Sequence, residues 1–213
     1  MTYLRLVRRT TYCGAFAITM KSRLKSGELL QVTTAKEWRR WLKRHYKSER
    51  EIWLIHWKKH SGRPRIAYND AVEEALCFGW IDSTVRSVDE NRFAQRFSPR
   101  SPKSQYSQAN KERLRALAKQ GKVIKEVLAS AADVIAQEDD DFEVPPDIFT
   151  QIAASKKAWP NFQRLSPAYI RIRIAFIDGA RNRPEEFEKR LRYFIKMTEK
   201  NKQFGFGGIE KHY

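Results

Sequence analysis

Side chains able to hold an anion are concentrated in one short stretch, residues 96–110 (RFSPRSPKSQYSQAN). Arginine and lysine bring positive charge, and serine and asparagine bring hydrogen-bonding groups that suit a hydrophobic core poorly. A helix is expected to begin at the end of this stretch, where unpaired backbone N–H groups attract negative charge. We interpret it as an anion-binding loop with the following candidate residues: Trp80, Arg96, Ser98, Arg100, Ser101, Lys103, Ser104, Tyr106, Ser107 and Asn110. A well-capped helix with solvated cations is the alternative explanation.

Asp82, which follows Trp80 and Ile81, could serve as a general base, and Glu73 and Glu74 on the preceding helix have the same ambiguity. A structural ion pair of Asp82 with Arg96 or Arg100 is the simpler expectation. Aromatic residues also interleave with the cations, and such a pattern can stack a nucleobase beside a bound phosphate. Core packing explains Trp80 equally well, so Tyr106 is the ring that we expect to be exposed.

Patterns typical of metal or cofactor sites are missing from the sequence. His56 and His60 lie four residues apart, but in a strand followed by a turn, where they would not converge on a metal. The chain has no phosphate-binding glycine motif and no recognisable nucleophile and base pair. The two cysteines, Cys13 and Cys77, are far apart, which predicts no disulfide and fits a reducing compartment. We therefore expect no metal, no cofactor and a cytoplasmic protein.

Charge is the most unusual property of the composition. The chain has 213 residues with 42 Lys and Arg against 25 Asp and Glu, a formal net charge of +17. Such a field attracts nucleic acids, anionic metabolites or acidic protein surfaces, although it also simply favours solubility. Residues 126–150 are the exception, because they contain only acidic charges, and Pro145 and Pro146 follow the densest part. We interpret this interval as a linker between two basic parts.

Hydrophobic periodicity predicts an α+β fold, in which a small antiparallel sheet with flanking helices precedes a helical C-terminal region. Thr33 or Thr34 should cap the first helix, with Glu37 completing a capping box. Residues 51–57 should form a central strand, and residues 85–88 and 92–97 a hairpin. A helix should open near Asp70 and stop at Gly79, and another should run from Ser104 or Ser107 to Lys119. The remaining predicted helices are 145–154, 158–165, 167–179 and 184–200.

These patterns divide the chain into five segments. We expect an N-terminal extension (1–30), an α+β core domain with the motif loop (31–136), an acidic linker (137–146), a helical region (147–202) and a tail (203–213). The first segment loosely imitates a signal peptide, but its apolar stretch is short and no clear cleavage site follows, so export is not expected. No run of residues is apolar and long enough to cross a membrane.

Three motifs together resemble a known family. They are ALCFGWIDS (75–83), the loop sequence RFSPRSPKSQYSQANKERL (96–114) and PAYIRIRIAFIDGARNRPEEFEKRL (167–191). In this combination the chain is similar, over roughly residues 35–200, to the YdeI/OmpD-associated family, also called bacteriocin-protection proteins. The resemblance implies a link to survival under antimicrobial peptides and envelope stress, without naming a reaction. Tyr106 stands where we expect Trp in such sequences, which keeps an aromatic ring in place.

Three functions are compatible with these observations. The first is non-catalytic binding of an anionic partner, either DNA or RNA or a phosphate-bearing ligand, through the basic loop. The second is a small enzyme acting on a phosphorylated or carboxylated metabolite, with Arg96, Arg100 and Lys103 as a clamp and Asp82 as base. The third is a protein-interaction module that uses the helical C-terminal half. The sequence favours the first.

Overall fold

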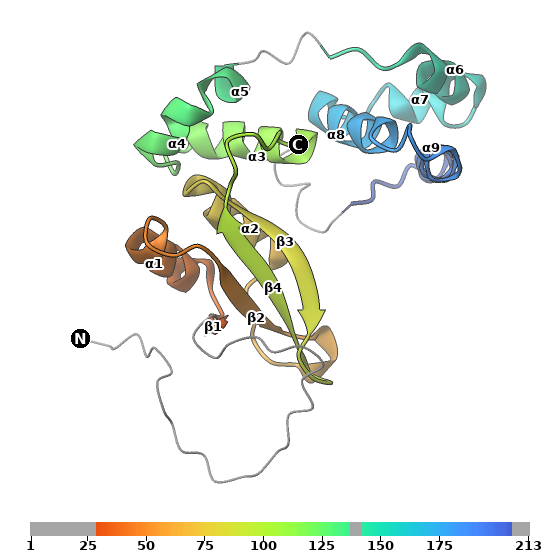
Figure 1. The fold of residues 1–213 in the computed structure, drawn as a ribbon. Helices are drawn as coiled ribbons and strands as arrows, with labels where there is room; N and C mark the ends of the chain where they lie inside the picture. Colours follow the sequence, from red (N-terminus) through yellow and green to blue (C-terminus); the bar gives the residue numbers. More distant parts are fainter. Residues whose placement is uncertain (1–28, 137–141, 206–213) are drawn as a thin grey trace.

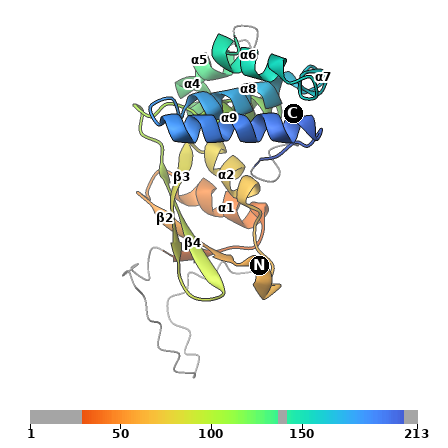
Figure 2. The ribbon, with the colours of Figure 1, turned by 90° about the vertical axis from the view of Figure 1, so that its right-hand side faces the viewer.

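The computed structural model describes residues 29–136 and 142–205. These form an α+β part and, beside it, a purely helical part (Figure 1). Viewed from the side, the helical part lies across one end of the sheet and its helices (Figure 2). The predicted N-terminal extension lies almost wholly outside the described residues, as do positions 137–141 of the predicted acidic linker and positions 206–213 of the predicted tail.

A four-stranded sheet forms the base of the α+β part, in the order β1-β2-β4-β3. Its strands are β1 (Leu29–Gln31), β2 (Ile52–Trp57), β3 (Trp80–Ser87) and β4 (Arg92–Pro99). β4 pairs antiparallel with both β2 and β3, as predicted, and β2 is an interior strand. The sheet is nevertheless mixed, because β1 adds in parallel to β2. A strand of three residues is too short to show a period of its own, so the sequence did not indicate it.

Two helices cover one face of this sheet, α1 (Ala35–His45) and α2 (Tyr68–Cys77). The predicted capping box of α1 is confirmed, since Thr34 accepts from the Glu37 amide at 3.2 Å and the Glu37 carboxylate accepts from the Thr34 amide. α2 begins two residues before the predicted Asp70. It is followed by Gly79 at a φ of 73°, a backbone conformation that glycine adopts without strain. A short 3-10 helix, η2 (Lys59–Ser61), follows β2.

The hairpin strands extend further than predicted, and this changes the shape of the motif loop. β3 already starts at Trp80, so that Asp82 lies within a strand, and β4 continues through Ser98 and Pro99. The irregular loop is therefore confined to residues 100–107, and α3 (Gln108–Lys119) follows it with Ser107 as its N-cap.

Two short helices, α4 (Lys125–Ser130) and α5 (Ala132–Ala136), complete the α+β part and were not predicted. The helical part contains the four helices that the sequence predicts: α6 (Pro146–Ala154), α7 (Trp159–Phe162), α8 (Pro167–Asp178) and α9 (Pro184–Glu199). It has its own buried core, which includes Ile148, Ile152, Tyr169, Leu191 and Phe194. The described helices include none long and apolar enough for a membrane span.

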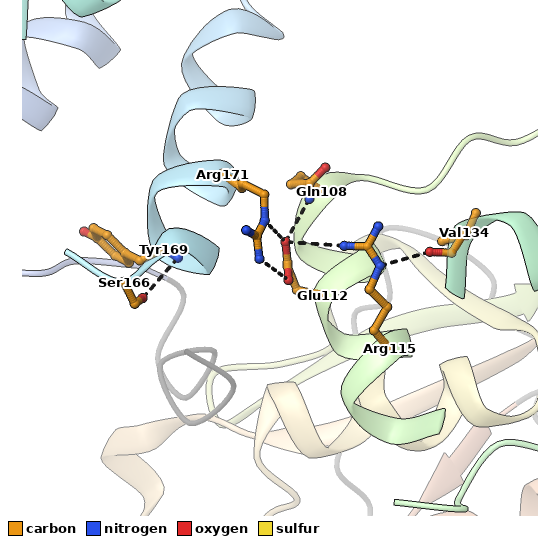
Figure 3. Close-up of polar contacts among 7 residues, drawn as sticks. All are labelled: Gln108, Glu112, Arg115, Val134, Ser166, Tyr169 and Arg171. Carbon is orange, nitrogen blue, oxygen red and sulfur yellow. Dashed lines mark hydrogen bonds and ion pairs between the residues drawn. The ribbon is translucent and has the colours of Figure 1, made fainter. Parts of the chain in front are cut away.

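A buried ion pair joins the two parts (Figure 3). Arg171 of α8 donates to both carboxylate oxygens of Glu112 on α3, with N–O distances of 2.7 and 3.1 Å. Gln108 donates to the same carboxylate at 2.8 Å, and Arg115 lies 3.9 Å from it. Although burial raises the pKa of Glu112, the hydrogen bonds from Arg171 and Gln108 lower it below its usual value. The contact therefore fixes α8 against α3 as an ionised, hydrogen-bonded pair.

Candidate functional site

Arg100, the central cation of the predicted loop, is used to hold the loop itself together. Its guanidinium donates to the carbonyl oxygens of Ser104, at 3.0 Å, and of Gln105. It also lies over the Tyr106 ring, 3.7 Å from the centroid, and Tyr106 is half-buried rather than exposed. Burial lowers the pKa of Arg100. The short segment from β4 to α3 is thus folded around this arginine.

The other predicted residues before Ser107 do not gather around one point. Arg96 pairs with Glu51, so the expected ion pair between Asp82 and Arg96 or Arg100 is not formed. Trp80 is buried in the core, where its Nε1 donates to the Tyr46 carbonyl at 3.1 Å. Ser98 is half-buried in β4, and the remaining members of the set are exposed, namely Ser101, Lys103 and Ser104.

A cavity of about 420 Å³ lies nearby, between the α+β part and the helical part. Of the predicted residues, Asp82, Ser107 and Asn110 line it. None of Arg96, Arg100 and Lys103 does, so the predicted clamp does not face Asp82 across this cavity. The remaining lining residues come from α2, α3, α8 with its C-cap Gly179, and α9: Tyr68, Gln108, Ala109, Arg113, Ile172, Arg173, Ala175, Phe176, Gly179 and Arg190. We call this cavity the interdomain cleft.

The N-terminus of α3 forms one wall of the interdomain cleft. Ser107 caps the helix by accepting from the Asn110 amide at 3.3 Å. The amides of Gln108 and Ala109 belong to the first turn, which has no acceptors within the helix, and both residues line the cleft. The positive end of the helix dipole lies at the same place. This wall is therefore suited to a negatively charged group.

Arg173 of α8 faces this wall from the helical part. The residue is only 5 % exposed, and its Nε is buried without a hydrogen-bond partner in residues 29–136 and 142–205. Its guanidinium lies over the rings of Tyr169 and Phe204, at 5.3 and 5.0 Å from their centroids. Buried arginines are normally paired with an anion or with several carbonyl oxygens. Within the described structure Arg173 makes only these ring contacts.

Two further arginines, Arg113 and Arg190, line the interdomain cleft, and hydrogen bonds to neighbouring residues hold both side chains. Arg113 donates to the side-chain oxygens of Asn110 and Asn69 at 2.9 and 2.7 Å. Arg190 donates to the Phe176 carbonyl at 2.7 Å and to the Glu186 carboxylate at 2.8 Å, and it stacks on the Phe176 ring at 3.8 Å. These contacts fix the orientation of both guanidinium groups at the edge of the cavity.

Asp82 provides the negative charge of the interdomain cleft. Its Oδ2 accepts from the hydroxyl of Tyr68 at 3.0 Å and from the side-chain amide of Gln95 at 2.9 Å. Burial, together with the nearby Asp82 charge, raises the pKa of Tyr68 to about 12, so the phenol stays protonated and donates to Asp82 at neutral pH. The lining holds three arginines and one carboxylate, and one of these arginines, Arg190, is paired with Glu186 at 2.8 Å.

Sequence reasoning missed the cleft residues of α8 and α9 because it looked for cations in polar loops. A usable signal was present in α8, where PAYIRIRIAFID places Arg171 and Arg173 in an otherwise apolar helix. Arginines in such a setting are buried and need partners. One of these two finds Glu112, and the other lines the cavity.

Metal-binding geometry is not found in residues 29–136 and 142–205, which contain no group of three or more His, Cys, Asp or Glu side chains suitable for a metal ion. His56 is buried and stacks on Phe93, with 4.9 Å between ring centroids, whereas His60 is exposed in η2. Cys77 is buried, and burial raises the pKa of its thiol to about 11. It therefore behaves as a small apolar side chain, while Cys13 lies outside the described residues.

Comparison with known proteins separates the two parts of the chain. Residues 30–130 match the model of a domain of unknown function, and this region contains the motifs at 75–83 and 96–114. Residues 141–201 match the model described as bacteriocin-protection, YdeI or OmpD-associated, and this region contains the motif at 167–191. No curated protein and no solved structure matched the chain. The helical part, residues 141–201, is therefore similar to the bacteriocin-protection, YdeI- or OmpD-associated family.

Proposed function

We propose that this protein binds a small anionic ligand in the interdomain cleft, without chemical turnover. The observation that carries the proposal is Arg173, a buried guanidinium with no anionic partner in the described structure, opposite the N-terminus of α3. A carboxylate or a phosphate between them would accept from Arg173 and from the first-turn amides of α3.

The energetic argument rests on the cost of burying a charge. An arginine withdrawn from water is unfavourable unless hydrogen bonds and an opposite charge offset the loss. In many proteins a carboxylate supplied by the fold does this, as Glu112 does for Arg171. For Arg173 the described chain supplies aromatic rings, which leaves the hydrogen-bonding capacity of the guanidinium for a ligand.

The direct test is stabilisation of the protein by inorganic phosphate or acetate, measured as a shift of the melting temperature at constant ionic strength. We expect at least one of these anions to raise it by a few degrees at a concentration of about ten times Kd. The variant Arg173→Met keeps the apolar stem of the side chain but removes the charge. It should weaken binding by about 10- to 100-fold, the typical loss for a charge-assisted hydrogen bond.

Arg192→Met is the matched control, because Arg192 is exposed on α9 and does not line the interdomain cleft. Both variants lower the net charge by one. If the two weaken anion binding equally, or if neither phosphate nor acetate stabilises the wild-type protein, the cleft does not bind anions as proposed.

A second candidate function, proton transfer in the same cleft, is favoured by one observation: the hydrogen bond between Tyr68 and Asp82 places a carboxylate and a phenol at the cavity wall. Asp82 could then act as a general base toward a bound anion. The substitution Asp82→Asn separates the two functions. For a binding protein it removes repulsion and should tighten phosphate or acetate binding severalfold, measured by calorimetry; for an enzyme it should abolish turnover of the bound compound.

The family description connects this ligand site to bacteriocin protection only indirectly. A chain of net charge +17 is poorly suited to capturing a cationic peptide. We therefore propose that ligand binding, rather than capture of a peptide, is what the protein contributes to any protective effect.

A further inference from the structure

A second cavity, of about 110 Å³, adjoins the interdomain cleft within the helical part. It lies between α8, α9 and the segment that follows α9. The two cavities have three lining residues in common, Arg173, Phe176 and Arg190. Four of its other lining side chains are apolar or aromatic, Ile177, Tyr193, Phe194 and Phe204, and two charged ones, Glu186 and Lys189, complete the lining.

Aromatic rings form much of this second cavity and are held in fixed relative positions. Phe204 contacts Tyr193 edge-on, with centroids 4.7 Å apart, and lies 6.3 Å from Phe194. Phe176 and Tyr193 are 42 % and 48 % exposed, so part of each ring is open to solvent. Surfaces of this kind favour contact with an uncharged, apolar group.

The two cavities are adjacent, because the same three residues, Arg173, Phe176 and Arg190, line both of them. Arg173 and Phe176 lie one helical turn apart on α8, so a ligand that accepts from Arg173 is next to the Phe176 ring. Arg190 stacks on that ring, 3.8 Å from its centroid, and keeps it in position. A charged group at the N-terminus of α3 and an apolar group among Tyr193, Phe194 and Phe204 can therefore belong to one molecule.

We propose that the ligand of this protein is amphipathic, with one anionic head and one uncharged apolar tail, and that the second cavity binds the tail. This inference rests on the proposed function, because it places the head in the interdomain cleft. It adds a ligand class: a medium-chain or aryl carboxylate, or a phosphate ester with an apolar substituent.

The test uses straight-chain carboxylates of increasing length, from acetate to octanoate, titrated calorimetrically into the full chain. Each methylene group that enters the second cavity should tighten binding by about fourfold, and the gain should stop once the cavity is filled. Tyr193→Ser should remove most of this dependence on chain length while leaving acetate binding unchanged.

Phe149→Ser is the matched control. Phe149 is 42 % exposed on α6 and, like Tyr193, makes an edge-on ring contact, here with Trp159 at 5.3 Å, but it lines neither cavity. This variant should keep the dependence on chain length. The melting temperatures of both variants verify that they fold.

The possible results separate the two proposals. If acetate and octanoate bind equally well and both depend on Arg173, the tail site is wrong and the anion site stands. If no carboxylate and no phosphate binds, both are wrong. If affinity rises with chain length but ignores Tyr193→Ser, the tail binds elsewhere and the inference is overturned.

Discussion

His56 shows how strongly the fold restricts a single ionisable side chain. It lies in the interior strand β2, is 2 % exposed, and stacks on Phe93. Burial, and to a lesser extent the charge of Arg65, lowers its pKa to about 4, so it is neutral at physiological pH. The sequence pattern of a strand followed by a turn argued against a metal ligand, and in the structure His56 is a core residue.

This shifted pKa predicts that stability falls in mild acid. The unfolded chain takes up a proton at His56 near pH 6.5, whereas the folded chain does so only near pH 4, so lowering the pH between these values favours unfolding. The loss attributable to His56 is about 3 kcal/mol over this range. Urea denaturation at pH 7 and pH 4 measures it, and His56→Phe should flatten the dependence on pH.

His60→Gln serves as the comparison, because His60 is exposed in η2. Its substitution should leave the change in unfolding free energy with pH as in the wild type. An equal effect of both substitutions would show that the acid sensitivity does not come from burial of His56.

At the scale of single residues, types and spacing predicted candidate anion-binding groups but not which of them lie together. Of the candidates, Ser107, Asn110 and Asp82 line the interdomain cleft. Arg100 does not, because the carbonyls of its own loop lie within reach of its guanidinium. The choice between a local and a distant partner depends on three-dimensional distances that a one-dimensional pattern does not contain.

Among the elements, α3 has two roles along its length. Its first turn, at Gln108 and Ala109, forms a wall of the interdomain cleft. One turn later, Glu112 receives Arg171 of α8 and so positions the opposite wall (Figure 3). The geometry of the cleft therefore depends on an ion pair that does not itself line it.

Substitution of Glu112 tests this dependence. Glu112→Ala leaves the buried charge of Arg171 without its carboxylate, and should lower the free energy of unfolding by about 3–5 kcal/mol. It should also weaken anion binding in the cleft, because α8 is no longer held against α3. Chemical denaturation and calorimetry measure the two effects.

The matched substitution is Glu126→Ala, which removes an ion pair between Glu126 and Lys47 at 3.0 Å whose side chains are 58 % and 69 % exposed. Exposed pairs contribute little to stability. If Glu126→Ala were as harmful as Glu112→Ala, burial of the pair would not be the reason for the effect.

Elements with strong local signals were predicted well, and those without them were missed. The capping box of α1, the Ser107 cap of α3 and the prolines that open α8 and α9 each fix a boundary in the sequence. β1, α4 and α5 have only three, six and five residues, and α4 has no side-chain cap, so tertiary packing decides them.

For the whole molecule, a net charge of +17 predicts some binding to any polyanion. We expect the affinity for a short DNA or RNA oligonucleotide to fall steeply as salt is raised, since phosphate contacts release counterions. Arg173→Met and Arg192→Met should weaken this binding equally and slightly, because each removes one charge. Fluorescence anisotropy at several salt concentrations measures it.

A different outcome would favour nucleic-acid binding as the main activity. If the oligonucleotide bound tightly at moderate salt and Arg173→Met alone weakened it, the interdomain cleft would be a nucleic-acid site.

The α+β fold class and the helical C-terminal region were evident from periodicity. The cleft was not, because its two walls come from segments with separate cores, and only their docking creates it.

The two separate cores have a thermodynamic consequence. Parts with independent hydrophobic interiors can melt at different temperatures, linked here through contacts such as the one between Glu112 and Arg171. A molecule lodged between them and touching both would make their melting more cooperative, so that two overlapping heat-absorption peaks sharpen into one. Calorimetric scans with and without octanoate would reveal such coupling even before any crystal of the complex is obtained.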